Sequence, residues 1–282
     1  MVRSILSPQI AVRHLIRRFR LGPIDFRLAL QAVDRPQYAY GVKQAARLAA
    51  RLGLPAVSVI EFGVATGEGL IKLEEYAAIF GKAFGVTVNV YGFDLGTGLP
   101  SSTDYRDLPY VWQGGFYRMD VDGLKSRLRA ARLYLGDVRE TVREFLASEA
   151  PPVGFISFDL DLYSSTTSAL QIFDASDAAV LPRVLCYFDD ITSNDHRLHC
   201  DRVGELRAIL EFNQRSKEEI IAPLGVINSE ILFPSVWMQQ LYVYHRFSHG
   251  EYNTYIGDRP AAAIEAGERR RPAATVTAMP AR

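Results

Sequence analysis

The segment V-S-V-I-E-F-G-V-A-T-G-E-G-L, from Val57 to Leu70, is the most informative part of this chain about its fold. An apolar run rich in β-branched residues ends in an acid, and three glycines then precede a helical pattern: Gly63, Gly67 and Gly69. Such a run is typical of a buried parallel strand, and glycines let the backbone turn sharply and approach a ligand closely. The order G-x-x-x-G-x-G differs from the G-x-G-x-x-G of dinucleotide-binding proteins, and no Lys-Ser/Thr pair follows as in a P-loop. The stretch predicts a strand, a tight turn and a helix, with the glycines serving either a ligand or close strand–helix packing.

Apolar runs and helical patterns alternate along the rest of the chain. We expect strands at residues 57–64, 88–94, 132–136, 153–159 and 183–189, and helices at 36–52, 68–82, 138–148, 164–175 and 202–216. This alternation predicts βαβ units and an α/β fold with a doubly wound, mostly parallel sheet. The apolar stretches 219–224 and 240–247 have little helical pattern between them, so we expect them to add an antiparallel pair of strands.

The length of 282 residues favours one α/β domain with additions over two equal domains. We expect a helical segment over residues 1–55, the main domain over 56–258, and a disordered tail over 259–282, which is rich in Ala, Pro and Arg. One long irregular stretch, 95–123, interrupts the main domain and carries five aromatic residues. Such a loop is often a lid or a binding wall, and its aromatic side chains can also anchor it to the body of the domain.

Composition limits the classes of function. The 32 basic and 32 acidic side chains balance, which argues against non-specific nucleic-acid binding. No apolar stretch approaches the ~20 residues that a membrane-spanning helix needs. The chain has two cysteines, and Cys186 lies in an apolar run where a small buried side chain is expected. A disulfide scaffold is therefore not predicted, and a reducing, cytoplasmic location fits.

The N-terminal segment is basic, with five arginines and no acid in the first 24 residues. This composition could indicate a targeting segment or a helix that lies on a membrane surface. The apolar residues among these arginines have the spacing of an amphipathic helix: Ile10, Val12, Leu15 and Ile16. We therefore favour a helix that packs its apolar face on its own domain.

Acidic residues end nearly every predicted strand: Glu61, Asp94, Asp137, Asp159 and Asp189. In open parallel sheets, ligands bind beyond the carboxyl ends of the strands. Because an unpaired buried charge costs several kcal/mol, a row of acids at this edge predicts a polar or cationic ligand. Singly, each acid could also be a helix N-cap, and Asp137 and Asp159 do precede helical patterns. Asp94 is placed to accept both hydroxyls of a ribose, and Asp137 to reach an adenine amino group.

A second group of carboxylates lies further along the chain. F-D-L-D-L-Y-S-S-T places Asp159 and Asp161 on one face if the strand persists, and F-D-D-I supplies Asp189 and Asp190. Strands joined by one helix would bring these acids together, and carboxylates that converge without a nearby Lys or Arg repel one another. A hard divalent cation such as Mg²⁺ would remove that repulsion, lower the pKa of a bound substrate hydroxyl, and leave a carboxylate to accept its proton. The alternative is that these aspartates cap helices and are solvated.

Taken together, E-F-G-V-A-T-G-E-G-L, D-L-D-L-Y-S-S-T and F-D-D-I resemble the motifs of class I S-adenosylmethionine-dependent methyltransferases. The match is more specific to the metal-dependent sugar O-methyltransferases of the macrocin type, and it covers about residues 57–215. The resemblance implies a Rossmann-like methyltransferase fold of seven strands with the last antiparallel. It also implies S-adenosylmethionine as cofactor and Mg²⁺-assisted methylation of a hydroxyl on a small molecule or natural product.

The resemblance also implies roles for individual residues, carried over by motif position. Asp161 would be the general base, and three residues would bind the metal: Asp159, Asp189 and Asp190. Six residues would bind the cofactor: Glu61, Gly63, Gly67, Gly69, Asp94 and Asp137. Glu61 could contact a water or the methionine ammonium, or only orient the loop.

The sequence leaves other functions open. A metal-free methyltransferase acting on a carboxylate or a nitrogen would use the same strand edge. A non-catalytic nucleoside-binding protein would keep only the cofactor pocket, and a nicotinamide-dependent oxidoreductase is disfavoured by the order of the glycines. The partner that we expect is a small-molecule acceptor, without nucleic acid or membrane. Whether the chain forms a homo-oligomer is also open.

Overall fold

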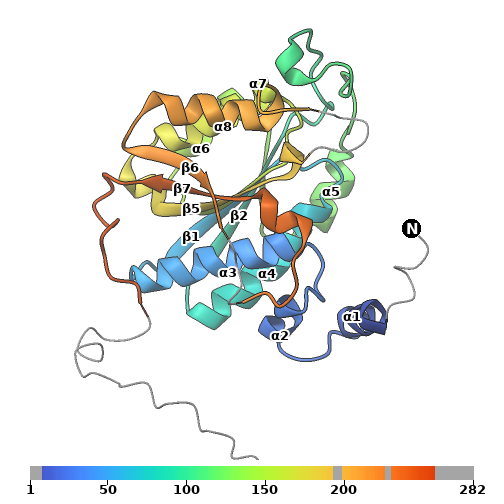
Figure 1. Cartoon of the computed structure of the whole chain (residues 1–282), viewed down its shortest axis with the longest axis vertical. Helices are drawn as coiled ribbons and strands as arrows, with labels where there is room; N and C mark the ends of the chain where they lie inside the picture. Colours follow the sequence, from blue (N-terminus) through green and yellow to red (C-terminus); the bar gives the residue numbers. More distant parts are fainter. Residues whose placement is uncertain (1–7, 193–198, 226–229, 258–282) are drawn as a thin grey trace, which may run out of the picture.

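The computed structural model describes residues 8–192, 199–225 and 230–257, so the tail predicted over 259–282 lies outside them. Seven strands form one sheet in the order β3-β2-β1-β4-β5-β7-β6 (Figure 1). The strands are β1 Ala56–Phe62, β2 Thr87–Asp94, β3 Arg132–Leu135, β4 Val153–Phe158, β5 Val180–Phe188, β6 Glu219–Pro223 and β7 Leu241–Arg246. β1 to β5 pair in parallel, whereas β7 is antiparallel to both β5 and β6. The predicted sheet, including its antiparallel last strand, is confirmed.

Helices cover both faces of this sheet (Figure 1). The α-helices of the described residues are α1 Pro8–Arg18, α2 Ile24–Ala29, α3 Pro36–Arg51, α4 Glu68–Phe84, α5 Val121–Arg127, α6 Val138–Leu146, α7 Tyr163–Ala169 and α8 Gly204–Arg215. α3 and α4 lie on one face of the sheet, and α6, α7 and α8 lie on the other. The five helices predicted from periodicity are present, although the one expected over 164–175 continues beyond Ala169 only as a 3-10 turn.

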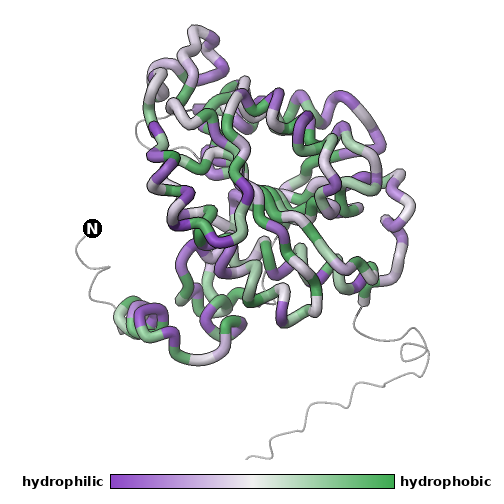
Figure 2. Tube along the Cα trace, turned by 180° about the vertical axis from the view of Figure 1, so that it is seen from behind, coloured by the Kyte–Doolittle hydropathy of each residue, from purple (hydrophilic) through white to green (hydrophobic). Residues whose placement is uncertain are grey.

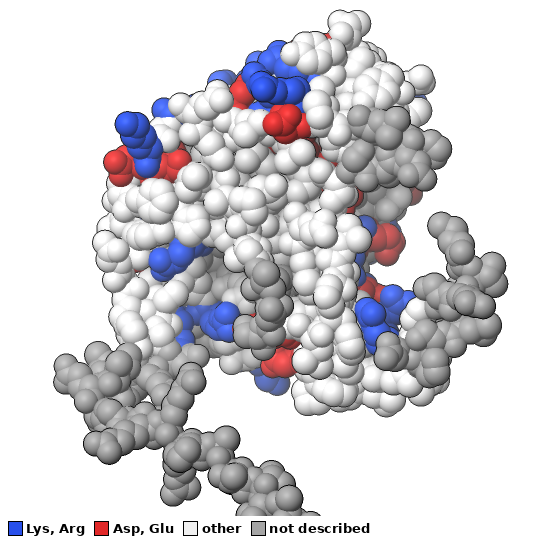
Figure 3. All heavy atoms as spheres, in the orientation of Figure 1, with Lys and Arg blue, Asp and Glu red and all other residues white. Residues whose placement is uncertain are grey.

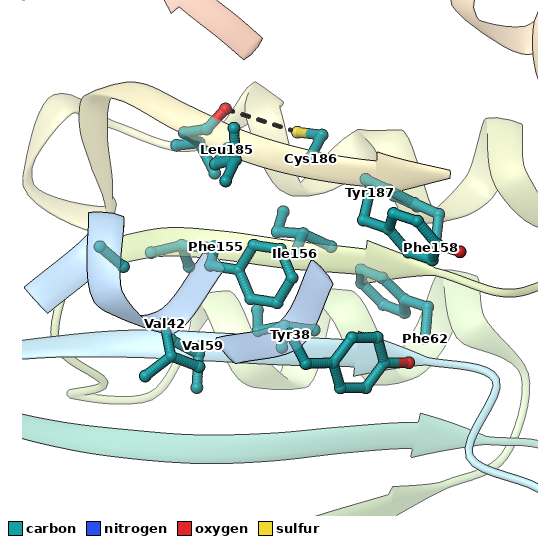
Figure 4. Close-up of a cluster of buried hydrophobic side chains, with 14 of the residues drawn as sticks. Tyr38, Val42, Val59, Phe62, Phe155, Ile156, Phe158, Leu185, Cys186 and Tyr187 are labelled. Carbon is teal, nitrogen blue, oxygen red and sulfur yellow. Dashed lines mark hydrogen bonds between the residues drawn. The ribbon is translucent and has the colours of Figure 1, made fainter. Parts of the chain in front are cut away.

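The buried apolar core fills both faces of the sheet, and on one face it lies between α3 and the central strands. β4 is buried along its whole length, and the ring of its Phe155 meets Tyr38 of α3 edge to face at 6.2 Å between centroids. Phe158 and Phe188, at the ends of β4 and β5, stack 4.5 Å apart. Figure 4 shows this cluster, with the hydroxyl of Tyr38 pointing toward the carboxyl ends of the strands. The packing thus fixes the strand ends, where the candidate site residues follow. Cys186 is fully buried, as predicted.

The N-terminal helix α1 does not bury its apolar face. Val12 is 54% exposed and Leu15 is 51% exposed. The contacts to the body come from the opposite, basic face, where Arg13 donates to the carbonyl of Gln31 and Arg17 lies 3.8 Å from Asp34. Both Figure 1 and Figure 2 show α1 standing apart from the helices that cover the sheet. The expectation that these apolar residues pack on their own domain is therefore wrong for Ile10, Val12 and Leu15, whereas Ile16 is half-buried.

Charge is mixed rather than concentrated on the one face of the molecule that Figure 3 shows. On the face shown in Figure 3, basic and acidic side chains form small groups, several of which adjoin a group of opposite sign. This distribution agrees with the zero formal net charge of the chain. Among the described residues, no helix combines the length and the apolar character that crossing a membrane requires.

Candidate active site

A cleft with a volume of about 590 Å³ lies at the carboxyl ends of β1 to β5. Most of the predicted site residues line it: Gly63, Asp94, Asp137, Asp159, Asp161, Asp189 and Asp190. Parallel strands present their carboxyl ends at the same edge of a sheet, which is why acids that are far apart in the sequence meet here. Glu61, Gly67 and Gly69 are not among the lining residues.

The glycine-rich turn brings the end of β1 against the end of β4. Gly63 has a φ of +83°, which is a left-handed conformation that favours glycine. A Cβ atom at this position would lie 1.7 Å from the carbonyl oxygen of Asp159. The turn is closed by the amide of Asp159, which donates to the carbonyl of Phe62 at 2.9 Å. No residue with a side chain would permit this approach, so Gly63 lets the glycine-rich turn lie directly against Asp159.

Glu61 is 2% exposed and is held from the α3 side of the sheet. The hydroxyl of Tyr38 donates to its Oε1 at 2.6 Å, and Ser157 Oγ donates to that hydroxyl at 3.0 Å. Burial raises the pKa of the Glu61 carboxyl to about 7, although the hydrogen bond from Tyr38 lowers it. A Cβ atom on Gly69 would lie 1.8 Å from Oε1, so this glycine makes room for the glutamate. In the sequence Tyr38 was apparent only as one apolar position of a helix.

Asp94, at the end of β2, accepts hydrogen bonds from two loops. Its Oδ2 accepts from the amides of Val64 and Ala65, both at 2.9 Å, and its Oδ1 accepts from the amide of Gly96 at 2.6 Å. An ionised carboxylate offers about four acceptor positions, so these three bonds leave little unused capacity. The predicted contact with both ribose hydroxyls therefore requires Asp94 to share or exchange some of its loop contacts.

Asp137 is the N-cap of α6. Its Oδ1 accepts from the amide of Arg139 at 2.8 Å, and the residue is exposed where it lines the cleft. The N-cap alternative is thus confirmed, and the predicted contact with adenine stays a prediction. The amide of Gly136 donates to the carbonyl of Asp94 at 3.0 Å, which keeps the ends of β2 and β3 side by side.

Asp159, Asp189 and Asp190 form the carboxylate cluster. Phe158 pairs with Phe188 in the parallel register of β4 and β5, so the acids that follow these residues emerge at the same level. One oxygen from each of the three acids lies within 4.8 Å of the others. This distance is roughly that between two ligands on opposite sides of a divalent cation bound at 2.0–2.6 Å. The donor set and its spacing therefore fit a hard cation such as Mg²⁺.

The pKa of Asp159 lies well above its usual range, because the carboxyl is buried and faces Asp189 and Asp190.

One arginine lies within electrostatic reach of these acids. Arg35 precedes α3, and burial disfavours its charged form. The groups around it, Glu61, Asp159 and Asp189 among them, outweigh burial and raise its pKa. Nothing in the sequence indicates this pairing, because Arg35 is remote from the acids along the chain. Arg35 therefore supplies a positive charge that the repulsion argument from the sequence did not include.

Three further residues hold the turn that carries Asp189 and Asp190. The hydroxyl of Tyr187 donates to Asp189 Oδ1 at 2.6 Å, and Gln240 Nε2 donates to the Asp189 carbonyl at 2.6 Å. The amide of Asp190 donates to Oε2 of Glu205, which is fully buried at the start of α8. Burial and the neighbouring Asp190 raise the pKa of Glu205 well above its usual range.

Sequence reasoning missed Glu205, although the sequence does carry a signal for it. Helical spacing places Glu205 on the same face of α8 as the buried residues Ala208, Ile209 and Phe212. A carboxyl on the apolar face of a helix is rare unless it has a partner. This anomaly could have marked Glu205 as part of the site before the structure was known.

Asp161 lines the cleft from a turn and not from the predicted continuation of the strand. The strand does not persist to this residue, because β4 ends at Phe158. Asp161 instead has a φ of +61° in the turn that leads into α7, and it is 7% exposed where it lines the cleft. The shared-face expectation for Asp159 and Asp161 is therefore wrong, although both residues do line the same cleft.

The irregular stretch 95–123 forms one wall of the cleft through Leu99, Pro100 and Tyr117. It is anchored to α7 by polar contacts rather than by its aromatic rings. Asp107 is buried and accepts from both the amide and the hydroxyl of Ser164, at 2.7 and 2.9 Å. Four of the five aromatic residues are exposed: Tyr105, Tyr110, Phe116 and Tyr117. Of these, Tyr117 also lines the cleft, as a binding wall would require.

Comparison with known proteins supports the fold. No family model and no curated protein matches the sequence. A crystal structure of the calicheamicin methyltransferase CalS11 aligns over 86% of this chain and 94% of its own, with 22% identity and a TM-score of 0.51. The apo structure of CalS11, a TDP-rhamnose 3'-O-methyltransferase, aligns over 86% and 96%, with 20% identity and a TM-score of 0.43. An O-methyltransferase from Bacillus cereus in complex with SAH aligns over 86% and 93%, with 14% identity and a TM-score of 0.36. The strand order and the first of these alignments give the chain the expected Rossmann-like methyltransferase fold.

Proposed function

We propose that this chain is an S-adenosylmethionine-dependent methyltransferase that methylates a hydroxyl group of a small molecule or natural product with the help of a divalent cation such as Mg²⁺. One observation carries this proposal. A single cleft joins the glycine-rich turn and Asp94 to the carboxylate cluster of Asp159, Asp189 and Asp190. A nucleoside and a metal-held acceptor would therefore face each other within one cavity. The fold, which a calicheamicin methyltransferase shares, supports the same function.

The residues of the cleft divide into two groups. Gly63, Asp94 and Asp137 would hold the cofactor, and Asp159, Asp189 and Asp190 would hold the cation. When bound, S-adenosylmethionine supplies the methyl group and the cation lowers the pKa of the acceptor hydroxyl.

Asp161 is the residue that we place as general base. Its side chain is nearly buried and lines the same cleft as Asp159. A carboxylate there can accept the proton that the hydroxyl loses. Methyl transfer needs little other acid–base chemistry, so most of the rate enhancement would come from orientation of the reacting atoms by the cleft walls.

The cleft walls support a cyclic or apolar acceptor. Tyr117, Leu99 and Pro100 line the cavity, and Phe116 lies exposed next to Tyr117, with 6.2 Å between their ring centroids. Aromatic and apolar walls with a few polar groups are common in sites for small organic molecules.

Arg35 favours a second candidate, a metal-free methyltransferase that acts on a carboxylate or a nitrogen. Its guanidinium already offsets part of the negative charge of Asp159 and Asp189. If that compensation is sufficient, chelators would leave the activity intact, whereas the first proposal requires the activity to be lost.

Calorimetric titration tests the proposal directly. S-adenosylmethionine and S-adenosylhomocysteine should each bind, and Mg²⁺ should give a binding heat that is lost in Asp189→Ala. Asp174→Ala is the matched control, because this exposed aspartate of the 3-10 turn after α7 is not part of the cleft lining. It should keep the Mg²⁺ heat.

The other possible results of this titration either refute the proposal or distinguish the two candidate functions. Absence of cofactor binding would refute both candidates. Cofactor binding without a Mg²⁺ heat requires turnover assays with and without chelator, since the cation can enter together with the acceptor. Chelator-resistant turnover would then select the metal-free candidate.

A further inference from the structure

A second cavity, with a volume of about 350 Å³, lies apart from the candidate active site. It is bounded by α3 and by the sheet at Gly154 of β4, Leu185 of β5 and Val243 of β7. Gly154 is the second residue of β4, whereas the candidate active site follows the last residue of that strand. Among the described residues, the two cavities share no lining residue.

The lining of this cavity combines positive charge with apolar side chains. Three arginines line it, and we therefore name it the arginine pocket: Arg47, Arg51 and Arg183. No Asp or Glu is among the described residues of the lining, and Leu48 and Leu224 extend its apolar wall. Apolar walls with a few polar groups, in a volume of roughly 300–1,000 Å³, are the usual form of a small-molecule site.

Arg183 is the arginine of this pocket whose charge has no acidic partner in the described part of the chain. Its Nη1 donates to the carbonyl of Tyr252 at 2.9 Å, and its guanidinium lies 5.0 Å from the centroid of that ring. Its Nη2 is buried without a hydrogen-bond partner. The residue opposite it on β7 is His245, whose pKa is lowered by burial and by the charge of Arg183. A buried polar atom without a partner is uncommon and points to a missing acceptor.

The other two arginines have polar partners on the protein. Arg47 pairs with Glu230 at 2.6 Å and also donates to Gln44. Arg51 donates to the carbonyl of Gly257 at 3.2 Å. Of the three arginines, Arg183 is therefore the one that can form a new ion pair within the pocket.

We propose that the arginine pocket is a second ligand-binding site, for a small organic carboxylate with an apolar body. The planar guanidinium of Arg183 matches the geometry of a carboxylate and binds it through charge-assisted hydrogen bonds. Leu48, Leu185 and Val243 would then cover the apolar body of the ligand. Burial of that apolar surface adds to the affinity, which an inorganic anion could not gain.

Binding in the arginine pocket would not compete with a ligand in the candidate active site. α3 runs along the sheet between the two cavities (Figure 1). Tyr38, in its first turn, bonds to Glu61 near the strand ends, whereas Arg47 and Leu48 lie in its last two turns. The 16 residues of α3 span about 24 Å at the usual helical rise. This site is therefore independent of the proposed function.

Calorimetric titration of the full chain with octanoate tests the proposal, because octanoate combines a carboxylate with an apolar chain. It should bind one site per chain with a Kd of about 1 mM or tighter. 1-Octanol, which has the same chain without the charge, and inorganic phosphate, which has charge without a chain, should each bind at least about 10-fold more weakly. Saturating S-adenosylhomocysteine should leave the octanoate affinity unchanged.

Substitution of Arg183 should reduce the octanoate affinity selectively. Arg183→Gln should weaken binding by roughly 10-fold or more, the loss expected for a hydrogen bond to a charged group. Arg183→Lys keeps the charge but not the planar fork, so it should restore only part of the affinity. Arg143→Gln is the matched control, because Arg143 is exposed on α6 and does not line the pocket. It should bind octanoate as the wild type does.

A second variant keeps the test valid if Arg183→Gln does not fold, which circular dichroism would establish. Leu48→Glu leaves Arg183 in place and puts a carboxylate into the pocket wall, so it should also abolish octanoate binding.

Four outcomes would overturn the proposal. They are a wild-type chain that does not bind octanoate, folded variants at Arg183 and Leu48 that bind it unchanged, binding of 1-octanol or phosphate as tight as that of octanoate, and displacement of octanoate by S-adenosylhomocysteine. The last result would place octanoate in the candidate active site instead.

Discussion

At the residue scale, the buried carboxyl of Glu61 links the site to the stability of the fold. In an unfolded chain this group loses its proton near pH 4.5, whereas in the folded protein its pKa is about 7. Between these values the folded state binds the extra proton, so the free energy of unfolding falls as the pH rises. The loss amounts to up to about 3 kcal/mol for a shift of this size.

The substitution Glu61→Gln should remove this pH dependence while keeping an oxygen that accepts from Tyr38. Its stability relative to wild type should therefore rise between pH 4.5 and pH 7. Urea unfolding at several pH values measures the difference. Glu144→Gln, at an exposed position of α6, should leave the curve parallel to that of wild type. A parallel curve for Glu61→Gln would show that the glutamate does not titrate in this range.

The position of some site residues could be predicted from the sequence, whereas that of others could not. Asp159 and Asp189 follow apolar runs directly, so their place at the end of a strand could be predicted from local pattern. Arg35 and Tyr38 could not be assigned in this way. Their contacts with the acids cross from α3 to the strand ends, and no local periodicity encodes a contact between layers.

At the element scale, the two turns that flank α4 differ in how much space they leave for a side chain. Gly63, in the turn between β1 and α4, has less space around it than Gly85, in the turn after α4. Gly63 and Gly85, at the two ends of the β1–α4 unit, both have positive φ angles. A Cβ atom at Gly63 would collide with the carbonyl of Asp159, whereas one at Gly85 would meet nothing within 4 Å. Alanine substitutions at these two glycines therefore distinguish the cost of a left-handed backbone from the cost of a steric collision.

Gly85→Ala should cost only the left-handed backbone penalty, about 1–2 kcal/mol. Gly63→Ala should cost several kcal/mol more, because the strand ends must separate, and it should also abolish cofactor binding. Thermal unfolding and calorimetry on both variants measure the two effects. Equal destabilisation of the two variants would contradict the close approach of β1 and β4.

Elements were predicted well where the hydrophobic period was clear, as in β1, β4 and α8. The direction in which α1 faces was predicted wrongly from equally clear periodicity. Periodicity identifies an apolar face but not what covers it, and in α1 the arginines contact the body and leave the apolar face outward.

At the scale of the whole molecule, ligand binding should stabilise the fold, because the cleft is built from the ends of five strands. A ligand at about 100 times its Kd contributes ~2.7 kcal/mol. For a chain of this size, S-adenosylhomocysteine should therefore raise the melting temperature by roughly 5–10 °C.

The matched control for this thermal shift is NAD⁺, which also contains adenosine and tests the oxidoreductase alternative. It should give a much smaller shift, because the glycine order is not that of a dinucleotide site. A large shift with NAD⁺ and none with S-adenosylhomocysteine would exclude the proposed cofactor.

The alternation of strands and helices, the parallel sheet and the row of acids at one edge could all be predicted from the sequence. These follow from local periodicity and from the rule that parallel strands end together. The groups that interact with those acids became apparent in the folded structure: Tyr38 with Glu61, Arg35 with Asp159, and Glu205 with the amide of Asp190. The folded structure also shows that α1 turns its apolar side outward. The physical reason is that such contacts depend on how layers pack and where charges find partners, and both are properties of the folded chain rather than of any segment.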